Sequence, residues 1–375
     1  MSELNFSRNR HSWKDKLFNM SFAYIIFIVI LALVGTMTLY SAGNGSWYPW
    51  AVKHLLRFGV ALLLMFGLAL VDAKYYYRFS YAFYFISLLL LVAVELIGHR
   101  GMGAQRWINL YFFKLQPSEF MKIGMVLFMA RYFSTITIQG IQSVRGIIIP
   151  AIFTILPVVL IALEPDLGTA LMLLLTAGMM FFAVGVQWWK FAGIGLVAGG
   201  CLPLIWKFLH EYQRNRVLIF FDPERDPLGT GYHIIQSKIA FGSGGIFGKG
   251  FLHGTQTHLN FLPEKHTDFI FTMFSEEFGM LGSLLLLALN VAVLIWGYMF
   301  AFRTRNYFAR LTIIGLNTNY FLYVFINIAM VMGLLPVVGV PLPLISYGGT
   351  VMFSIMASFG IILCMSVNQS SDNPD

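Results

Sequence analysis

The sequence is divided into long apolar blocks that are separated by short polar segments. Each block has roughly the 20 residues that a helix needs to cross a bilayer, and none alternates as the strands of a membrane barrel do. Composition agrees, because 58% of the residues are hydrophobic and only 11% are charged, against about 25% charged in an ordinary soluble domain. We therefore predict an all-α polytopic membrane protein.

We predict ten spanning helices within a single integral-membrane domain, residues 1–375. The first block is too long for the apolar region of a secretory signal peptide, and another block follows it, so we expect it to remain in the chain. The longest stretch without a predicted span is a loop between the seventh and eighth helices, residues 210–267. The predicted spans are residues 20–42, 51–71, 76–97, 117–134, 146–163, 167–186, 188–208, 268–300, 311–334 and 344–367.

The basic residues predict how the chain is oriented. Four of them lie in the tail 1–19, and basic residues flanking the spans are retained in the cytoplasm. Counting spans from there places the tail 368–375 in the cytoplasm and the long loop outside. Orientation therefore accounts for the formal charge of +8, and we expect no nucleic-acid partner. We expect the function in the long exterior loop.

Several basic residues nevertheless fall on the predicted exterior side, against the positive-inside rule. Two interpretations remain open. They pair with nearby carboxylates or are solvated, or they hold an anionic headgroup such as a diphosphate at the outer membrane surface. The candidates for binding a diphosphate are Arg106, Lys122, Arg214, Arg216 and Lys249.

The stretch "DPLGTGYHIIQSKIAFGSGGIFGKGFLHG", residues 226–254, contains eight glycines but matches no nucleotide-binding motif. A phosphate-binding P-loop would need glycine where Ser243 stands and serine or threonine where Gly250 stands, and a dinucleotide fingerprint would need glycine at Phe247. We therefore expect no organic cofactor. The segment is either a loop shaped for close approach of the backbone to a ligand or a flexible lid.

A metal site built on histidine is not favoured. Five of the eight histidines lie in the exterior segment, but no pair has the i, i+4 spacing of a metalloprotease helix. Cys201 and Cys364 each lie alone in an apolar block, so we expect neither a disulfide nor a cysteine metal site. A divalent cation such as Mg²⁺ or Mn²⁺ stays open as a way to neutralise a diphosphate.

Asp268 stands at the entrance of the eighth predicted span. If a helix begins there, Asp268, Thr272 and Glu276 recur at i, i+4 and i+8 and form a polar stripe on an apolar helix. Ionisable groups in a span cost about 2.5 to 3.5 kcal/mol each, so they usually face a cavity or a partner. The simpler interpretation is that Asp268 is an N-cap. The two roles are compatible.

Other polar groups gather at the same predicted side of the membrane. Glu119 and Lys122 stand at i, i+3 in "QPSEFMK", as an ordinary helix pair or as part of an outer cavity. Glu164 and Asp166 lie in the tight turn "EPDLGT", where a structural role is more common than a catalytic one. The proline- and glycine-rich segment 333–350 predicts a broken or re-entrant stretch that lines a cavity.

With these motifs in order, the chain closely resembles the shape, elongation, division and sporulation (SEDS) family over essentially its whole length. The wording of its glycine-rich and "HTDFIF" segments is similar to the RodA-like, rod-shape elongation branch. The motifs are "GAQRWINL", "QPSE", "EPDLGT", "YQRNRV", "LPEKHTDFIF" and "NIAMVMGLLPVVGVPLPLISYGGT".

The resemblance implies a peptidoglycan glycosyltransferase that polymerises the lipid-linked disaccharide-pentapeptide, lipid II, on the outer face of the bacterial inner membrane during elongation. It implies that Asp268 is the catalytic residue, that Glu119 and Lys122 support it, and that Ser346 of "SYGGT" contacts substrate. It also implies a class B penicillin-binding protein, a transpeptidase, as partner beside the membrane lipids.

Physical chemistry favours the same reaction. No nucleotide sugar is available outside the cell, so the donor must be activated on a lipid diphosphate, a leaving group that needs charge neutralisation rather than a proton. One carboxylate, Asp268, then serves as base toward the acceptor hydroxyl, with inversion at the donor carbon. Two alternatives remain open: a transporter that moves lipid II across the bilayer, and a noncatalytic scaffold.

Overall fold

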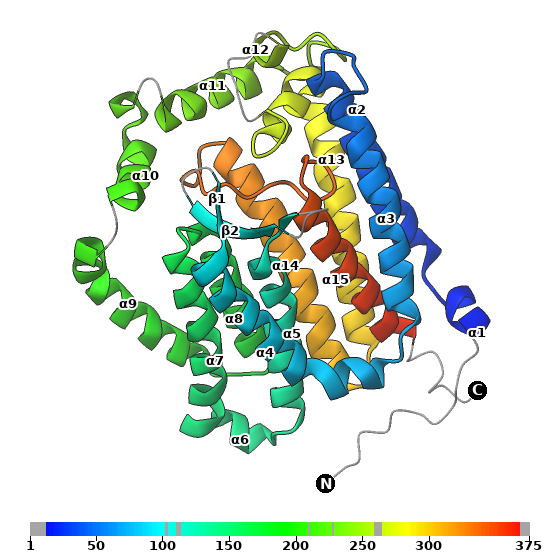
Figure 1. Cartoon of the computed structure of the whole chain (residues 1–375), viewed down its shortest axis with the longest axis vertical. Coiled ribbons are helices and arrows are strands. Elements are labelled where there is room, and N and C mark those ends of the chain that lie inside the picture. Colours follow the sequence, from blue (N-terminus) through cyan, green and yellow to red (C-terminus); the bar gives the residue numbers. More distant parts are fainter. Residues whose placement is uncertain are drawn as a thin grey trace.

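The computed structural model describes most of the chain as a bundle of long helices with a helical arch on one side (Figure 1). In the view of Figure 1, the start of α2 (Phe22–Ala42) and the end of α15 (Gly349–Val367) lie at the lower end of the bundle. The described residues are 13–101, 104–109, 114–208, 211–226, 229–258 and 265–367.

Each of the ten predicted spans contains a helix, which confirms the helical membrane prediction. Seven of these helices are long and apolar enough to cross a membrane. Of the others, α8 is apolar but has 17 residues, and α5 carries Glu119, Lys122 and Arg131. Besides α2 and α15, the helices are α3 (Ala51–Leu70), α4 (Ala73–Ile97), α5 (Pro117–Ser134), α7 (Val144–Leu163), α8 (Leu167–Ala183), α9 (Trp188–Phe208), α13 (Ile270–Arg303) and α14 (Tyr307–Val331).

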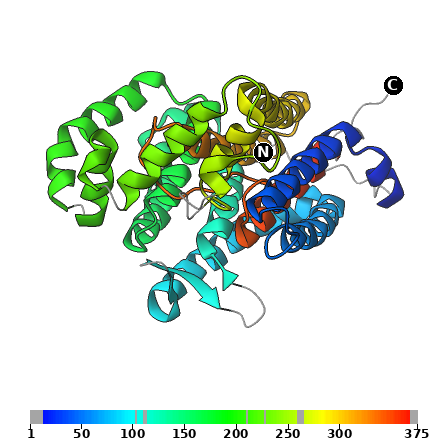
Figure 2. The same ribbon diagram turned by 90° about the horizontal axis from the view of Figure 1, so that it is seen from above.

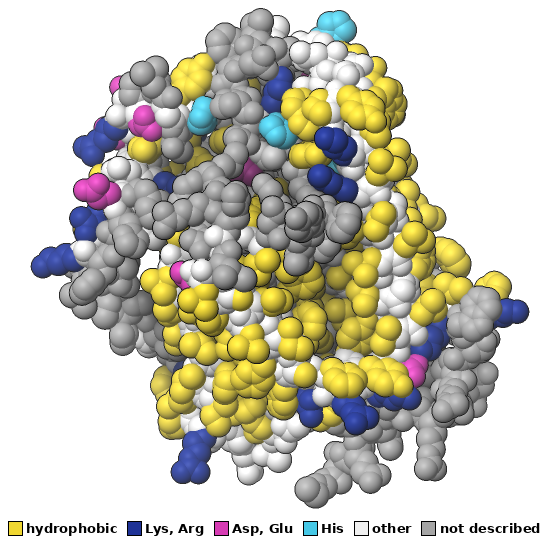
Figure 3. Space-filling model, viewed as in Figure 1, with side chains coloured by type: hydrophobic (Ala, Val, Ile, Leu, Met, Phe, Trp, Pro, Cys, Tyr) yellow, Lys and Arg dark blue, Asp and Glu magenta, His cyan; other side chains and the backbone are white. Residues whose placement is uncertain are grey.

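The centre of the bundle is formed by α14 and α15. In each of them 78% of the most apolar window is buried, against 28% in α3, α4 and α7, whose outer faces carry large exposed hydrophobic side chains. Figure 3 shows these side chains over the flanks and charged ones mainly toward the two ends. This distribution is expected for a protein whose flanks face lipid and whose polar side chains face inward.

A small antiparallel sheet departs from the all-α prediction. It has the strand order β1-β2-β3, with β1 at His99–Gly101, β2 at Ala104–Asn109 and β3 at Lys114–Leu115. The sheet lies at the edge of the bundle when it is seen from above (Figure 2). It joins α4 to α5, and its strands are too short to give an alternating pattern that sequence inspection recognises.

The predicted loop, residues 210–267, has secondary structure of its own in its described parts, and none of it is a candidate membrane span. It contains short helices, and α9 and α10 lead away from the bundle before α11 and α12 return over its end (Figure 1). The short helices of the chain are α1 (Trp13–Phe18), α6 (Ile138–Gln142), α10 (Glu211–Phe221), the 3-10 turn η1 (Pro223–Arg225), α11 (Thr230–Ser243) and α12 (Thr255–His258).

Helix α13 is broken at Gly279, whose backbone angles are φ 65° and ψ −163°. The break leaves backbone groups without helical partners, and the glycine-rich segment 244–250 inserts there and bonds them. This is required inside a membrane, where an unpaired backbone group costs several kcal/mol. The bonds join Lys249 N to Glu276 O (3.0 Å), Gly250 N to Glu277 O (3.0 Å), Met280 N to Gly245 O (2.9 Å) and Leu281 N to Ile246 O (3.1 Å).

Glycine is needed on both sides of this junction. A side chain at Gly248, where φ is 81°, would overlap the carbonyl of Glu277, and one at Gly279 would overlap the backbone nitrogen of Gly248. In the structure the glycines thus let two backbone segments of the protein pack closely together. This packing role differs from both sequence-based interpretations of the glycine-rich segment, a ligand-binding loop and a flexible lid.

Residues 332–348, between α14 and α15, are non-helical, as the proline and glycine content predicts, and residues 342–346 within them are buried. Leu344 has a positive φ of 63°, and a side chain at Gly35 of α2 would overlap its carbonyl oxygen. On the other side, a Cβ at Gly168 of α8 would lie 3.0 Å from the carbonyl oxygen of Val338. Small residues therefore let α2 and α8 enclose this segment.

Candidate active site

Asp268 lies in a turn over residues 265–269, directly before α13, and is partly exposed. The helix begins at Ile270 with Phe269 at the N-cap position, so Asp268 precedes the cap by one residue and the N-cap interpretation is wrong. A Cβ on Gly339 would lie 3.4 Å from Oδ2 of Asp268. The carboxylate is therefore directed toward the non-helical segment between α14 and α15.

Hydrogen bonds to main-chain atoms hold this turn. The side chain of Asn327 on α14 donates to the carbonyl oxygens of Asp268 (2.9 Å) and Val340 (2.7 Å). Ser346 donates to the carbonyl of Thr267 at 2.7 Å and accepts from a backbone N–H of its own segment. Ser346, predicted to contact substrate, thus fixes the position of the Asp268 turn, and substrate contact stays a prediction.

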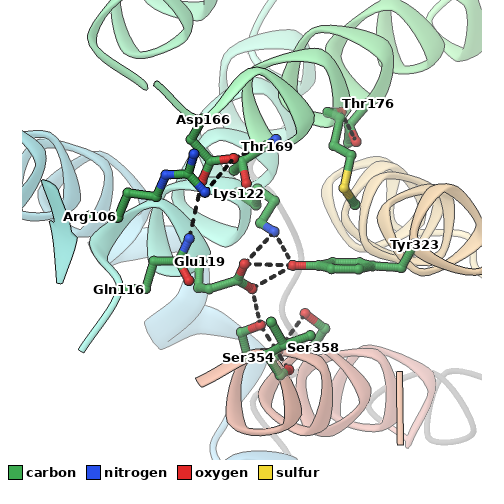
Figure 4. Close-up of polar contacts among 12 residues, drawn as sticks. Arg106, Gln116, Glu119, Lys122, Asp166, Thr169, Thr176, Tyr323, Ser354 and Ser358 are labelled. Carbon is green, nitrogen blue, oxygen red and sulfur yellow. Dashed lines mark hydrogen bonds and ion pairs between the residues drawn. The ribbon is translucent and has the colours of Figure 1, made fainter. Parts of the chain in front are cut away.

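Glu119 and Lys122 form a buried polar cluster with Tyr323 and Ser354 (Figure 4). The Nζ of Lys122 lies 2.7 Å from Oε1 of Glu119, and Glu119 and Lys122 are 2% and 1% exposed. Tyr323 donates to both carboxylate oxygens at 2.6 Å, Ser354 donates to Oε2 at 2.6 Å, and Lys122 also donates to the hydroxyl of Tyr323. The cluster joins α5, α14 and α15 at the bundle centre.

This cluster and the Asp268 turn are successive layers of one site. Tyr323 and Asn327 stand four residues apart on α14, so they lie on the same face, one turn apart. Tyr323 contacts the Glu119 cluster, while Asn327 contacts the backbone of Asp268. The sequence grouped Glu119, Lys122 and Asp268 at one end of the bundle, and the structure connects them through one face of α14, with Glu119 and Lys122 buried.

Arg106 on β2 binds the turn that follows α7 (Figure 4). Its Nε donates to the carbonyl of Glu164 at 3.3 Å, another nitrogen donates to the carbonyl of Pro165, and Nη1 lies 3.9 Å from Oδ1 of Asp166. Asp166 in turn accepts from Gln116 at 3.2 Å and from the backbone of α8 as its N-cap. Arg106 is therefore engaged by the protein, and diphosphate binding by Arg106 remains a prediction.

Glu164 is a carboxyl group with an altered acidity. It is 2% exposed, and neither of its side-chain oxygens has a hydrogen bond from the residues that the structure describes. Burial, helped by the negative charges of Asp166 and Glu95, raises the pKa of Glu164 to about 8, although the charge of Arg106 opposes the shift. At neutral pH this carboxyl is mainly protonated, which avoids an unpaired buried charge.

Lys249 pairs with Glu276, the third member of the predicted polar stripe. Its Nζ lies 2.7 Å from Oε1 of Glu276, which is fully buried and also accepts from the backbone of Gln256 at 2.9 Å. Thr272 forms a 2.8 Å hydrogen bond with Ser237 of α11. The stripe below Asp268 is thus explained by contacts with the segment that covers α13.

The remaining predicted cations lie on α10. The guanidinium of Arg214 donates to the carbonyls of Trp206 at 2.8 Å and Lys207 at 2.6 Å, at the end of α9. Arg216 is partly buried on the same helix. In the structure α10 stands in the arch at the side of the bundle (Figure 1), so Arg214 and Arg216 are not brought together with Asp268.

Sequence reasoning missed Tyr323, Ser354 and two cations on α3, Lys53 and Arg57. Tyr323 and Ser354 give no local signal, because single polar residues are common in spans and their partner Glu119 is more than 200 positions away in the chain. Lys53 and Arg57 did give one: they stand four residues apart at the predicted outer end of a span, so they share a helix face.

No ready-made metal site is evident among the described residues. Within them, no group of three or more His, Cys, Asp or Glu side chains is placed to hold an ion. Mg²⁺ in phosphate-transfer sites, however, is typically held by one or two carboxylates together with phosphate oxygens of the substrate. Asp268 fits that limited requirement, and the predicted divalent cation stays a prediction.

Comparisons with known proteins identify the family. A family model described as a cell cycle protein, uniting FtsW, RodA and SpoVE, matches residues 15–371. The peptidoglycan glycosyltransferase MrdB of Escherichia coli K12 is 40% identical over 96% of this chain and 97% of its own length. The stage V sporulation protein E of Bacillus subtilis is 34% identical over 91% of this chain and 95% of its own.

Solved structures agree with these relatives. A chain from a structure described as the coordination of polymerization and crosslinking by a peptidoglycan synthase complex aligns with a TM-score of 0.82 at 29% identity, covering 94% of this chain and 99% of that one. The rod shape determining protein RodA of Thermus thermophilus aligns with a TM-score of 0.71 at 26% identity, covering 94% and 98%. The chain belongs to the FtsW, RodA and SpoVE family of polytopic membrane proteins.

Proposed function

We propose that this protein is a peptidoglycan glycosyltransferase that polymerises lipid II into glycan strands during cell elongation. The names of its relatives support the activity, and the 40% identity to MrdB supports the elongation branch. The observation that carries the proposal is the placement of Asp268. This residue is partly exposed at one end of a mainly apolar bundle, on a turn whose backbone is fixed by Asn327 and Ser346.

The proposed chemistry needs one base and neutralisation of one leaving group. The 4-hydroxyl of the acceptor sugar attacks the anomeric carbon of the growing chain, and its proton passes to the carboxylate of Asp268. A carbon–oxygen bond forms, and the bond to the lipid diphosphate breaks with its electron pair left on the diphosphate. Attack from the opposite face inverts the anomeric carbon. General-base help of this kind contributes roughly 10² to 10⁴ in rate.

Glu119 and Lys122 act as supporting residues in this proposal. Their charges are satisfied by each other, by Tyr323 and by Ser354, so the cluster carries little net charge into the centre of the bundle. It holds α14 in register with α5 and α15, and α14 in turn carries Asn327, which binds the Asp268 turn. A fixed scaffold of this kind is what precise placement of a base requires.

The membrane setting follows the same proposal. We place the protein in the bacterial inner membrane with residues 1–19 and 368–375 in the cytoplasm and Asp268 on the outer side. The ends of α2 and α15 in the structure support this, since the start of α2 and the end of α15 share one end of the bundle and the turn 265–269 lies at the other. Lipid II, supplied on the outer leaflet, then meets the base directly.

A class B penicillin-binding protein is the proposed partner. The support is a structural neighbour whose description couples polymerization with crosslinking in one complex. Mg²⁺ or Mn²⁺ is proposed to assist the diphosphate; when bound, such an ion would neutralise phosphate charge. Removing divalent cations with a chelator should then slow polymerisation, and adding them back should restore it.

The test uses purified protein, alone and with its transpeptidase, given labelled lipid II in detergent. We expect ladders of glycan products. Detergent abolishes the two sides of a membrane, so a transporter of lipid II would produce no ladder there. A protein that yields none with the partner present, yet moves lipid II across vesicles, would overturn the proposal in favour of transport.

A further inference from the structure

Two cations on α3 stand beside the Asp268 turn. Lys53 is exposed and Arg57 is partly buried. Four residues separate them, so both side chains point from the same face of α3, one turn apart. Figure 3 shows basic side chains over the upper part of α3, beside a histidine and at the margin of the hydrophobic surface.

Neither cation is neutralised by the described part of the chain. Lys53 makes no hydrogen bond or ion pair there, and Arg57 contacts an aromatic ring, so the described residues leave its five N–H donors unused. This differs from Lys122 and Lys249, which each pair with a buried carboxylate. An arginine in a spanning helix usually faces a partner or a polar ligand, because exposing it to lipid is costly.

Arg57 is connected to Asp268 by a short chain of contacts. Its guanidinium lies 4.6 Å from the ring centre of Tyr347. The backbone of Tyr347 donates to the carbonyl of His266 at 2.8 Å, and the ring of His266 stacks on Trp50 at 4.6 Å with a 12° tilt. His266 precedes Asp268 by two residues. Arg57 therefore adjoins the turn that carries the proposed base, with aromatic rings between them.

An apolar stripe continues along α3 below the cations. Leu56, Val60 and Leu63 are 66%, 58% and 73% exposed, and their spacing places them on the side of the helix that carries Lys53. Two positive charges at the head of an exposed apolar stripe match an amphiphile with an anionic head and a long hydrocarbon tail. A diphosphate matches the two cations better than a headgroup with one negative charge, because its oxygens can bind both Lys53 and Arg57.

We propose that Lys53 and Arg57 bind the diphosphate of a polyprenyl-linked substrate, whose tail lies along α3. The inference rests on the proposed function and adds the residues that the sequence did not identify. Of the cations that were predicted, Arg106, Lys122, Arg214 and Lys249 are already engaged by protein atoms. Lys238, exposed on α11, has no second cation on its own helix.

The test measures binding of a polyprenyl diphosphate to the purified full-length protein in detergent. Arg57→Gln should weaken binding about tenfold and the double variant with Lys53→Gln about a hundredfold, since each removes one charge-assisted contact. Arg57→Lys should retain part of the affinity. Arg310→Gln, which removes an exposed charge at the other end of the bundle, is the control and should leave it unchanged.

A second arm replaces the probe with phosphatidylglycerol, an ordinary anionic lipid. A loss confined to the diphosphate supports the site. An equal loss of affinity for both lipids would show that Lys53 and Arg57 bind anionic headgroups in general and would contradict a diphosphate site. Unchanged diphosphate binding in the double variant would overturn the proposal. The unfolding midpoint of each variant, expected within a few degrees of the parent, separates lost binding from lost fold.

Kinetics with lipid II distinguish this inference from the proposed function. Arg57→Gln should raise KM about tenfold and leave the pH dependence of kcat unchanged, because it holds the substrate and does not take its proton. If the parent protein polymerises lipid II and the Arg57→Gln variant has the parental KM, the diphosphate site is refuted and the proposed function stands. If the parent binds polyprenyl diphosphate through Arg57 but forms no glycan, the proposed polymerase function is refuted and the site stands.

Discussion

At the residue scale, the Glu119 cluster shows how a charge pair is retained inside a membrane protein. Both charged groups are buried, and each oxygen of Glu119 has at least one donor. A satisfied pair of this kind adds little net stability, but removal of one partner leaves an uncompensated charge. The pair is therefore better understood as fixing the register of α5, α14 and α15 than as strengthening the bundle.

Truncating one partner should be much worse than truncating both. We expect Lys122→Met to lower the free energy of unfolding by about 3–5 kcal/mol, and the double variant with Glu119→Gln to recover a substantial part of that loss. Lys207→Met, at an exposed site on α9, should change stability by less than about 0.5 kcal/mol. Equal losses in the single and double variants, measured by thermal unfolding in detergent, would contradict this account.

Glu164 should make stability depend on pH. Its pKa is raised to about 8 in the folded protein, from an ordinary value of 4.5. Between these values the unfolded chain gains from ionisation and the folded protein does not, so this residue costs stability increasingly as pH rises, with the full cost reached above pH 8. Glu164→Gln should therefore raise the unfolding midpoint relative to the parent at pH 8.5 and not at pH 4. A difference that is constant across that range would refute the assignment.

At the element scale, the break in α13 is the feature on which the site depends. Gly279 opens the helix, and the glycine-rich segment closes the opened hydrogen bonds and brings Lys249 to Glu276. The first part of α13, which follows Asp268, is thus anchored independently of the long second part. Because the helix is broken, its first part is held by the glycine-rich segment and its second part packs within the bundle. An unbroken helix would have no free backbone groups for the glycine-rich segment to bind.

Gly279→Ala tests the role of the break. Alanine at a positive φ costs about 1–2 kcal/mol, and here its Cβ would also overlap backbone that cannot move aside. We expect a lower unfolding midpoint and a loss of polymerisation. Gly178→Ala in α8, where no atom lies within 4 Å of the added Cβ, should be neutral or stabilising. Equal behaviour of the two variants would contradict the account of the break.

At the scale of the whole molecule, the long apolar blocks were predictable because hydrophobic length is a local property, and all ten predicted spans contain a helix. Motif and orientation also predicted Asp268, Glu119 and Lys122 at one end of the bundle, where α14 now connects the Asp268 turn to the Glu119 cluster. The contacts of Tyr323, Ser354 and Arg57 could not be foreseen, since each joins segments far apart in the chain. The short strands and the helices within 210–267 lack the length or periodicity that a sequence pattern requires.

The molecule as a whole combines a buried centre, α14 and α15, with an arch of helices at its side (Figure 1). The buried α14 and α15 carry Asn327, Tyr323, Ser346 and Ser354 or lie directly beside them. The arch formed by α9 and α10 lies apart from this centre (Figure 1). The site is thus built on the most buried helices and lies toward the end of the bundle that α11 and α12 cover. Buried helices hold the catalytic side chains in place while the lipid substrate binds and leaves.

The central claim is that the carboxylate of Asp268 takes the proton of the acceptor sugar. Asp268→Asn keeps the size of the side chain and removes its basicity, so the most direct measurement is the rate of lipid II polymerisation by this variant, together with its unfolding midpoint and partner binding. The account predicts a rate lowered by about 10² to 10⁴ in a protein that folds and binds its transpeptidase normally. Polymerisation at the parental rate by a folded, partner-bound Asp268→Asn protein would contradict it.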